Sequence, residues 1–189
     1  MRQAIVFSGT VVLGLAPADG SLLWLRGWRT SYDVNAATPI FLPPNRLFVS
    51  SGYDTGAEVF QLAVGPRSVT VKDVWSSREM KNQFSSSVHL DGTIYGFNNR
   101  NLQAIDAATG EVRWRKGGFG HGSLLAADGR LIVLGDAGQL VLAEANPKRF
   151  VEQAAAQPLT GKHWTVPTLY GGRLYLRNES ELVCLKIAG

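Results

Sequence analysis

An internal repeat is the feature that most restricts how this 189-residue chain can fold. The stretch LQAIDAATGEVRW, residues 102–114, aligns without a gap onto the start of the chain, so that Gly110 and Trp114 fall on Gly20 and Trp24. A second element, an inner hairpin, recurs at intervals of 37 to 47 residues as NRLFVSSG, DGTIYGFN, DGRLIVLG and GGRLYLRN. A period of this length, with four short strands in each unit, is typical of a β-propeller blade.

The rest of the pattern also predicts an all-β chain. Apolar and polar residues alternate in short runs that Gly, Asn, Asp or Pro interrupt, which indicates strands joined by turns. No long stretch keeps a helical period, and residues 150–156 (FVEQAAA) come nearest to a helical turn. No apolar run approaches the roughly 20 residues that a membrane helix needs, so we expect no transmembrane segment.

The segment DAATGEVRW predicts its own hairpin. We expect Thr109 and Gly110 to close the turn, with Gly110 at the positive φ that bulged turns need. The carboxylate of Asp106 is expected to accept hydrogen bonds from backbone amides of the same turn.

Tryptophan marks the end of the outer strand in three units. Trp24, Trp75 and Trp114 recur at the same place, and each can bury about 150 to 250 Å². We therefore expect them to pack between neighbouring blades. In the unit after Trp114, Phe150 is expected to take the place of the tryptophan.

The first twenty residues allow two interpretations. Arg2, a mostly apolar run over residues 4–15 and the small residues 16–18 fit a secretory signal peptide with its cleavage site. The same residues fit two strands of a blade. A signal peptide has no reason to match a downstream blade in register, so we favour the strands.

The unit AIDAATGEVRW, preceded by GTIYGFNNRNL, resembles the PQQ-like (quinoprotein-type) β-propeller repeat family. The resemblance covers almost the whole chain, most completely at residues 91–114. It implies one propeller segment over residues 1–189 with four-stranded antiparallel blades. We expect three complete blades at 36–76, 84–116 and 122–154, with partial blades at 3–26 and 163–187. Because the two partial blades together bring six strands to a four-stranded blade, we expect an incomplete, C-terminal part of a ring of seven or eight blades.

Members of this family divide by function. Some hold pyrroloquinoline quinone and a calcium ion at the propeller axis, whereas others, such as the BamB lipoprotein of outer-membrane assembly, are cofactor-free binding scaffolds. The resemblance implies an adjacent Cys-Cys pair at the quinone, but Cys184 is the only cysteine. The run GDAG at residues 135–138 offers one carboxylate, where calcium needs several oxygen ligands. We therefore expect no cofactor within this chain.

Segments that enter the innermost strands of such propellers converge on the axis and are the candidate ligand or partner site. Their polar and aromatic residues are Tyr32, Asp33, Asn35, Lys81, Asn82, His121, Lys162, His163 and Trp164. Such a set could bind a peptide, a sugar or a small anion. The alternative is that these residues only cap strand ends and face a hydrated channel.

Charge and motifs exclude other classes. The net charge is +4, but Lys and Arg are dispersed rather than clustered, so we expect no nucleic-acid partner. The three histidines share no metal-binding motif, and no nucleophile elbow indicates a hydrolase.

These observations favour a non-catalytic binding or assembly scaffold over an enzyme, with another protein or the absent blades as partner. Two alternatives stay open: part of a quinoprotein oxidoreductase whose catalytic residues lie outside this chain, and a carbohydrate- or peptide-binding propeller. By resemblance alone, we expect the protein in the periplasm or cell envelope of a bacterium.

Overall fold

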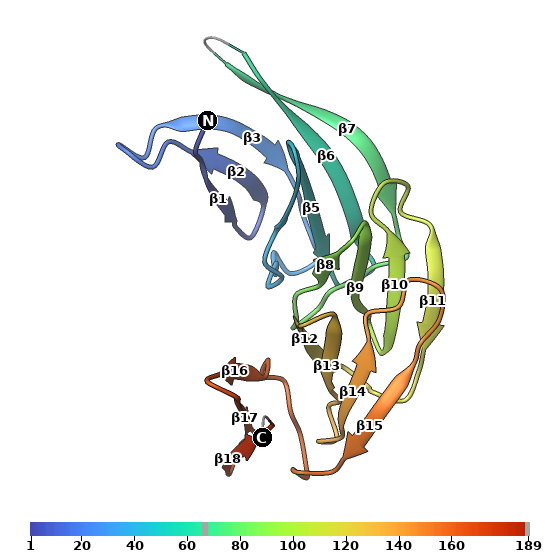
Figure 1. The fold of residues 1–189 in the computed structure, drawn as a ribbon. Helices are drawn as coiled ribbons and strands as arrows, with labels where there is room; N and C mark the ends of the chain where they lie inside the picture. The colour runs from blue at the N-terminus through green and yellow to red at the C-terminus, as the bar shows by residue number, and fades with distance from the viewer. Residues whose placement is uncertain (66–67, 188–189) are drawn as a thin grey trace. The chain divides into compact units, whose positions relative to one another are not determined.

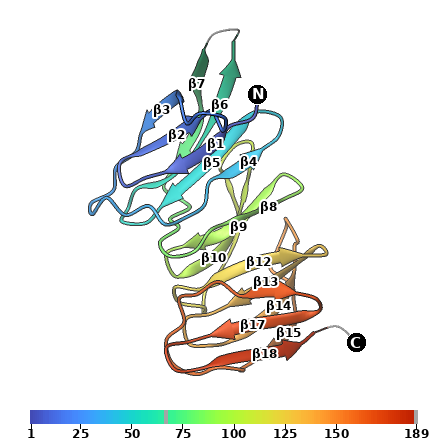
Figure 2. The same ribbon diagram turned by 90° about the vertical axis from the view of Figure 1, so that its left-hand side faces the viewer.

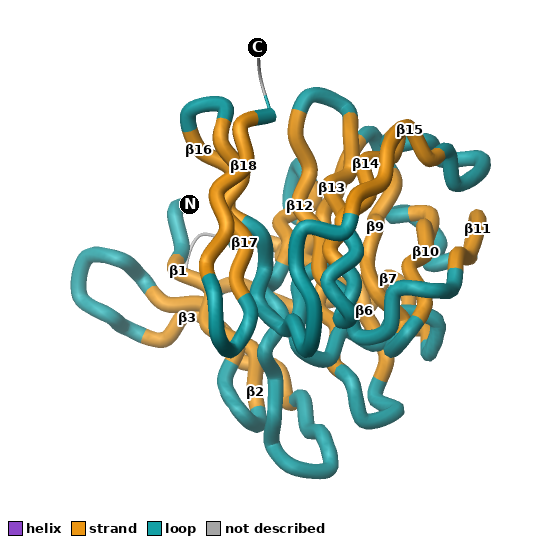
Figure 3. The backbone as a smooth tube through the Cα atoms, turned by 90° about the horizontal axis from the view of Figure 1, so that it is seen from below, coloured by secondary structure: helices purple, strands orange, loops and turns teal. Residues whose placement is uncertain are grey.

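The computed structural model describes residues 1–65 and 68–187, and its regular structure there is entirely β-strand (Figure 3). Residues 66–67 and 188–189 of the expected segment 1–189 lie outside the described part. The strands form five antiparallel sheets of three or four strands, each in chain order, as the blades of a propeller do. The all-β blade architecture predicted from the repeat is therefore confirmed. The chain separates into two compact units, Met1–Gln83 and Phe84–Gly189.

The first unit holds two sheets (Figure 1). The three-stranded sheet contains β1 (Ala4–Phe7), β2 (Val11–Leu15) and β3 (Leu22–Gly27). The four-stranded sheet contains β4 (Ile40–Leu42), β5 (Arg46–Ser51), β6 (Gly56–Val64) and β7 (Val69–Ser77). Because β1 and β2 pair with each other and β2 pairs with β3, the interpretation of the N-terminal residues as strands is confirmed.

The second unit holds three sheets, which Figure 2 shows from a second direction. The first contains β8 (Val88–Leu90), β9 (Thr93–Asn98), β10 (Asn101–Asp106) and β11 (Val112–Lys116). The next contains β12 (Ser123–Ala127), β13 (Arg130–Leu134), β14 (Leu140–Glu144) and β15 (Glu152–Ala156). The last contains β16 (Thr168–Tyr170), β17 (Arg173–Arg177) and β18 (Leu182–Lys186).

Residues 150–156, which come nearest to a helical pattern in the sequence, contain no helix, because residues 152–156 form β15, which pairs with β14. All five side chains of β15 are exposed, so this strand has no alternation between a buried and an exposed face. Its composition, with three alanines in succession, favours a helix locally. The hydrogen bonds to β14 override that local preference.

A β-bulge at one position marks the last strand pair of four sheets. The pairing shifts where β3, β7, β11 and β15 meet β2, β6, β10 and β14. The residue that directly follows each bulge residue pairs with a residue of the preceding strand in the same sheet. These residues are Trp24, Trp75, Trp114 and Ala154. We call this place the tryptophan position. Phe150 was expected to occupy it in the fourth of these sheets, and that expectation is wrong because Ala154 does.

Two of the tryptophans pack against the next sheet of their own unit. The ring of Trp24 meets Phe60 of β6 edge-on, with centroids 5.7 Å apart. Trp114 donates from Nε1 to the Asn146 carbonyl oxygen at 2.8 Å and meets the Phe150 ring edge-on at 5.8 Å. Trp75 is half-buried and lies 6.1 Å from Phe48 of its own sheet. The indole rings thus fill space between sheets at the sites of Trp24 and Trp114.

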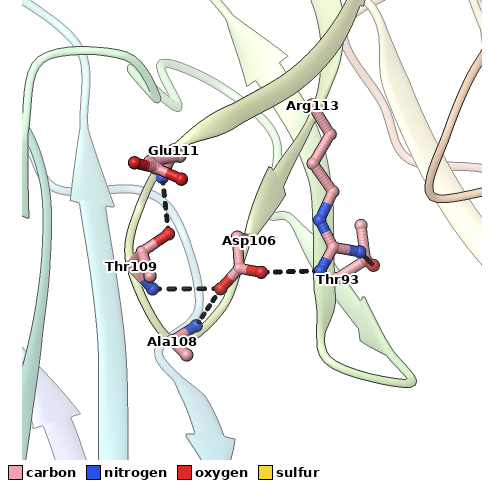
Figure 4. Close-up of polar contacts among 6 residues, drawn as sticks. All are labelled: Thr93, Asp106, Ala108, Thr109, Glu111 and Arg113. Atoms are coloured by element: carbon pink, nitrogen blue, oxygen red, sulfur yellow. Dashed lines mark hydrogen bonds and ion pairs between the residues drawn. The ribbon is translucent and has the colours of Figure 1, made fainter.

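Figure 4 shows the turn between β10 and β11. The Asp106 Oδ1 atom accepts hydrogen bonds from the Ala108 and Thr109 amides at 2.7 and 3.0 Å, and Gly110 has a φ of 78°. Oδ2 of Asp106 pairs with the Arg113 guanidinium at 2.6 Å. Chiefly through the Arg113 hydrogen bond, these contacts hold the pKa of Asp106 below its usual value. One carboxylate therefore stabilises the turn and the start of the outer strand.

Candidate functional site

In the first unit, two aromatic rings and an ion pair meet near the turn between β5 and β6. The Tyr32 ring, which is 73% exposed, meets the Tyr53 ring edge-on with centroids 5.1 Å apart. Lys81 Nζ lies 2.7 Å from Asp54 Oδ1, and this hydrogen bond lowers the pKa of Asp54. Tyr53 and Asp54 have φ of 55° and 60°, a region that costs non-glycine residues energy. The contacts from Tyr32 and Lys81 hold this turn.

The asparagines of the first unit serve the backbone. Asn35 donates from Nδ2 to the carbonyl oxygens of Ser8 and Gly9 at 2.8 and 3.0 Å, and its Oδ1 accepts from the Ser51 hydroxyl at 2.6 Å. Asn82 is 1% exposed, and its backbone amide donates a hydrogen bond to the Ser50 hydroxyl at 3.0 Å. These two residues tie loops to strands and offer little surface to a ligand.

Asp33 belongs to the loop between β3 and β4. It is exposed, has a φ of 52°, and its amide donates to the Thr30 carbonyl oxygen at 3.3 Å. Its backbone lies so close to Gly9 that a Cβ on Gly9 would come within 2.8 Å of the Asp33 carbonyl oxygen. Asp33 therefore packs closely against a turn, with its carboxylate outside.

In the second unit, residues from the segments before β8, β12 and β16 come together in one aromatic cluster. Phe84 stacks on Trp164 with ring centroids 4.3 Å apart and planes 18° apart. His121 meets the Phe84 ring edge-on at 5.8 Å. Lys162 Nζ lies 3.5 Å from the centroid of the Trp164 ring. Because Phe84 covers one face of the indole, Lys162 must lie over the other. We call these four residues the Trp164 cluster.

Hydrogen bonds to Asp136 hold the backbone of the segments that carry the Trp164 cluster. Asp136 Oδ2 accepts from the His121 amide at 2.8 Å, and the Asp136 carbonyl oxygen accepts from the His163 amide at 3.0 Å. His163 is 2% exposed, and its Nδ1 donates to the Gly161 carbonyl oxygen at 2.8 Å. His163 therefore acts as a buried support, whereas Trp164 stays 43% exposed.

Only some of the candidate residues come together: Tyr32 and Lys81 both contact the turn between β5 and β6, and the candidates of the second unit lie in or next to the Trp164 cluster. Sequence reasoning missed Tyr53, Asp54 and Phe84, which complete the two groups. Phe84 lies in a segment expected to face the site, but nothing in its local sequence separates it from a core phenylalanine. Tyr53 and Asp54 lie between Gly52 and Gly56 in the turn after β5, so the glycines predict the turn but not the partners of its two central residues.

The described residues hold no cluster of three or more His, Cys, Asp or Glu side chains that could bind a metal ion. In the same part of the chain, no helix is long and apolar enough to cross a membrane.

Two stretches of the chain, residues 2–116 and 98–187, match the family model described as "Outer membrane protein assembly factor BamB". Together these stretches include nearly every residue. The chain belongs to this family. The membership agrees with the repeat in the sequence and with the blades in the structure, and it confirms the resemblance to the PQQ-like propellers.

Solved structures agree on the fold. BamB from Moraxella catarrhalis matches 97% of this chain with a TM-score of 0.50 at 13% identity. The computationally designed Ika8 protein matches 97% with a TM-score of 0.59 at 10% identity. A chain in a structure of S. cerevisiae dbp5 bound to nup159, gle1, ip6 and adp matches 96% with a TM-score of 0.62 at 13% identity. The chain spans 69%, 57% and 54% of these three chains, respectively.

No curated protein sequence matches the chain. The quinone and calcium ion of some propellers also find a poor fit among its residues. The only cysteine, Cys184, lies in β18 rather than beside a second thiol. The single carboxylate of the GDAG run, that of Asp136, accepts a hydrogen bond from the His121 backbone amide.

Proposed function

We propose that this chain is a non-catalytic β-propeller scaffold of the bacterial cell envelope, and that it binds another protein through the Trp164 cluster. The observation that carries the proposal is the half-exposed indole of Trp164, which is fixed between Phe84 and Lys162. Tryptophan is enriched among the residues that dominate protein–protein binding energy, and a side chain that is already ordered loses less entropy on binding. The family description, an outer-membrane assembly factor, supports a protein partner and an envelope location.

The geometry favours a protein over a sugar. A sugar ring stacks on a free indole face, but Phe84 and Lys162 cover the two faces of Trp164. The exposed edge of the indole, together with the Lys162 ammonium, suits apolar and acidic side chains of a partner.

Site-specific photo-crosslinking tests this proposal in cells that encode the protein. A photoreactive residue replaces Lys162, and in a matched control it replaces Lys116, which lies 5.7 Å from the Phe150 ring in the same unit. We expect an adduct with an envelope protein from position 162 and not from position 116. A Trp164→Ala change should reduce that adduct by about tenfold, the effect of losing a dominant interface residue. Equal adducts at both positions, or an adduct insensitive to Trp164, would contradict the proposal.

A further inference from the structure

Tyr53 is a conformational outlier in the turn between β5 and β6. Among the described residues, six non-glycine residues have a positive φ, and Tyr53 is the only one of them that is neither aspartate nor asparagine. Aspartate and asparagine are enriched in this region of backbone conformation, whereas a tyrosine is uncommon there. Because residues held in such conformations cluster at ligand-binding sites, Tyr53 marks a candidate site.

Both central residues of this turn have a positive φ. The Thr55 amide donates to the Gly52 carbonyl oxygen at 3.1 Å, and Tyr53 and Asp54 between them have φ of 55° and 60°. A turn with two successive positive φ angles suits glycine and asparagine best. The chain places glycine on either side, at 52 and 56, but has large side chains at the two central positions. These side chains are therefore kept at a cost in backbone energy.

The end of β7 and the segment after it hold the turn on one side. A Cβ on Gly56 would come within 2.3 Å of the Ser77 carbonyl oxygen, so the two backbones are in close contact. Lys81 Nζ, which lies farther along the same segment, is 2.7 Å from Asp54 Oδ1. The turn therefore packs tightly on this side, and the ion pair fixes the position of the Asp54 carboxylate.

The Tyr32 ring contacts the turn from the loop between β3 and β4. This loop is itself ordered, because the Thr30 hydroxyl donates to the Val34 carbonyl oxygen at 3.1 Å and accepts from the Val34 amide at 2.8 Å. The Tyr32 ring meets the Tyr53 ring edge-on, with the ring planes 67° apart, and Tyr32 is 73% exposed. Tyr32 is thus an aromatic residue that is both exposed and held in position.

The Tyr32 ring has a free face. An edge-on contact engages at most one face of a ring, and within the described part of the chain no ring other than Tyr53 and no cation lies over Tyr32. Trp164 differs, because Phe84 and Lys162 cover both faces of its indole. A fixed ring with a free face suits a sugar, since the face carries partial negative charge and the C–H groups of a pyranose carry partial positive charge.

The Asp54 carboxylate supplies hydrogen-bond acceptors beside this ring pair. Lys81 bonds Oδ1, whereas the described residues give Oδ2 no hydrogen bond, and the Asp54 side chain is 81% exposed. Chiefly through the Lys81 hydrogen bond, the pKa of Asp54 is lowered, so the carboxylate is charged at neutral pH. A charged carboxylate oxygen can accept hydrogen bonds from two hydroxyl groups. Neighbouring hydroxyls of a pyranose ring are donors of this kind.

We propose that Tyr32 and Asp54 form a carbohydrate-binding site, in which a pyranose ring stacks on the Tyr32 ring and donates hydrogen bonds from its hydroxyls to Asp54. Because an acidic sugar would be repelled by the Asp54 carboxylate, the ligand is a neutral glycan. The strained turn positions Tyr53 against Tyr32 and Asp54 against Lys81, which explains why its side chains are kept. The inference goes beyond the proposed scaffold function and does not rest on it, because no residue of the Trp164 cluster takes part.

NMR titration of the whole chain with two neutral tetrasaccharides tests the site. The probes are chitotetraose and maltotetraose, which share the pyranose ring but represent N-acetylated and plain glucans. We expect at least one of them to shift the ring resonances of Tyr32 and the amide resonances of residues 52–56. Binding of one probe alone would support the site and identify the kind of glycan. The absence of shifts with both probes, or shifts confined to other residues, would overturn the proposal.

Substitutions at Tyr32 test the stacking contact. Tyr32→Ala should weaken binding of the sugar about tenfold, whereas Tyr32→Phe, which keeps the ring, should retain it. Tyr170→Ala is the matched control, because Tyr170 is 78% exposed and lies in the second unit. Both tyrosines are exposed, so the variants should fold normally, which the same spectra report directly. An equal loss in the Tyr170 variant, or no loss in Tyr32→Ala, would contradict stacking on Tyr32.

A substitution at Asp54 tests the carboxylate. Asparagine tolerates a positive φ and keeps the shape of the side chain but removes its charge, so Asp54→Asn should lower the affinity for the sugar about tenfold. Asp128→Asn is the matched control, because Asp128 is also exposed, has a φ of 49° and lies in the second unit. An unchanged affinity in Asp54→Asn would exclude the carboxylate as an acceptor for the sugar.

Two further measurements separate this site from a protein interface. A photoreactive residue in place of Tyr32 should give no protein adduct in cells, and a protein adduct from this position would replace the glycan with a protein segment as the occupant. Trp164→Ala should leave sugar binding intact, because Trp164 is not part of the site. Sugar binding that persists without the Lys162 adduct would reject only the Trp164 interface, and the reverse result would reject only the carbohydrate site.

Discussion

At the scale of single residues, the Asp106 carboxylate both accepts hydrogen bonds from a turn and forms an ion pair. Its Oδ1 atom bonds two amides of the turn, and its Oδ2 atom holds Arg113. Asp19, in the equivalent turn of the first unit, bonds the Ser21 amide at 3.0 Å, but the described residues give it no ion pair. The difference separates the contribution of the ion pair from that of the turn.

Asp106→Asn should lower the free energy of unfolding by about 0.5 kcal/mol at pH 7, because the amide keeps an acceptor for the turn but loses the ion pair. The pKa of Asp106 is lowered in the folded state, so its contribution is present above about pH 4 and is lost as the pH falls below that value. Urea unfolding at pH 7 and pH 3 should show the gap between the two proteins closing. Asp19→Asn should cost less at pH 7, and a gap that persists at pH 3 would exclude the ion pair as its source.

The sequence suffices to predict the turn at Asp106 because its backbone partners lie within three residues. The Trp164 cluster could not be predicted in the same way. Phe84 reaches Trp164 and His121 only after three segments distant in sequence have been brought together by the sheets. The segments were identifiable from the repeat, whereas the stacking partner of Trp164 was not.

At the scale of elements, the bulged strand pair is the unit that repeats, and the sequence alone aligned one of its copies incorrectly. Backbone hydrogen bonds close the turns from Asp106 to Glu111 and from Glu144 to Val151, so the second turn is two residues longer. Ala154 lies three residues after Val151, as Trp114 lies three residues after Glu111, whereas Phe150 directly precedes Val151 and lies before the strand. The sequence alignment used an aromatic residue to mark the tryptophan position, but the register of the strand pair determines which residue occupies it.

Gly14 gives this element a direct test. It faces the tryptophan position of the first sheet, and a Cβ there would lie only 2.2 Å from Trp24 Nε1. Gly14→Ala should displace the indole, break its 2.6 Å bond to Gln3, and destabilise the chain by about 1 to 3 kcal/mol.

Gly27 is the matched control, because it lies in β3 of the same sheet and its added Cβ would meet no atom within 4 Å. Gly27→Ala should change stability by less than about 0.5 kcal/mol. Thermal unfolding checks both variants, since each kcal/mol corresponds to about 2 to 4 °C in a chain of this size. Equal changes in Tm for the two variants would show that the Trp24 indole keeps its position when Gly14 gains a side chain.

At the scale of the whole molecule, the same fold serves cofactor chemistry in some propellers and binding in others, so function has to be argued from side chains. Three carboxylates are engaged with the protein itself: Asp136 with the His121 amide, Asp54 with Lys81, and Asp106 with Arg113. The contacts of Asp54 and Asp106 lower the pKa of these two carboxyl groups and so favour the charged form in place.

The proposed scaffold therefore predicts no response to pyrroloquinoline quinone and calcium. A ligand present at 100 times its dissociation constant stabilises the folded state by about 2.7 kcal/mol, which would raise the Tm of this chain by roughly 5 to 10 °C. We expect a shift below about 1 °C, and no reduction of an electron-accepting dye when an alcohol or aldose is added. The control is calcium alone, which separates cation binding from quinone binding. A rise in Tm that needs both, accompanied by dye reduction, would replace the scaffold with an oxidoreductase. A rise with calcium alone would show a cation site that does not depend on the quinone.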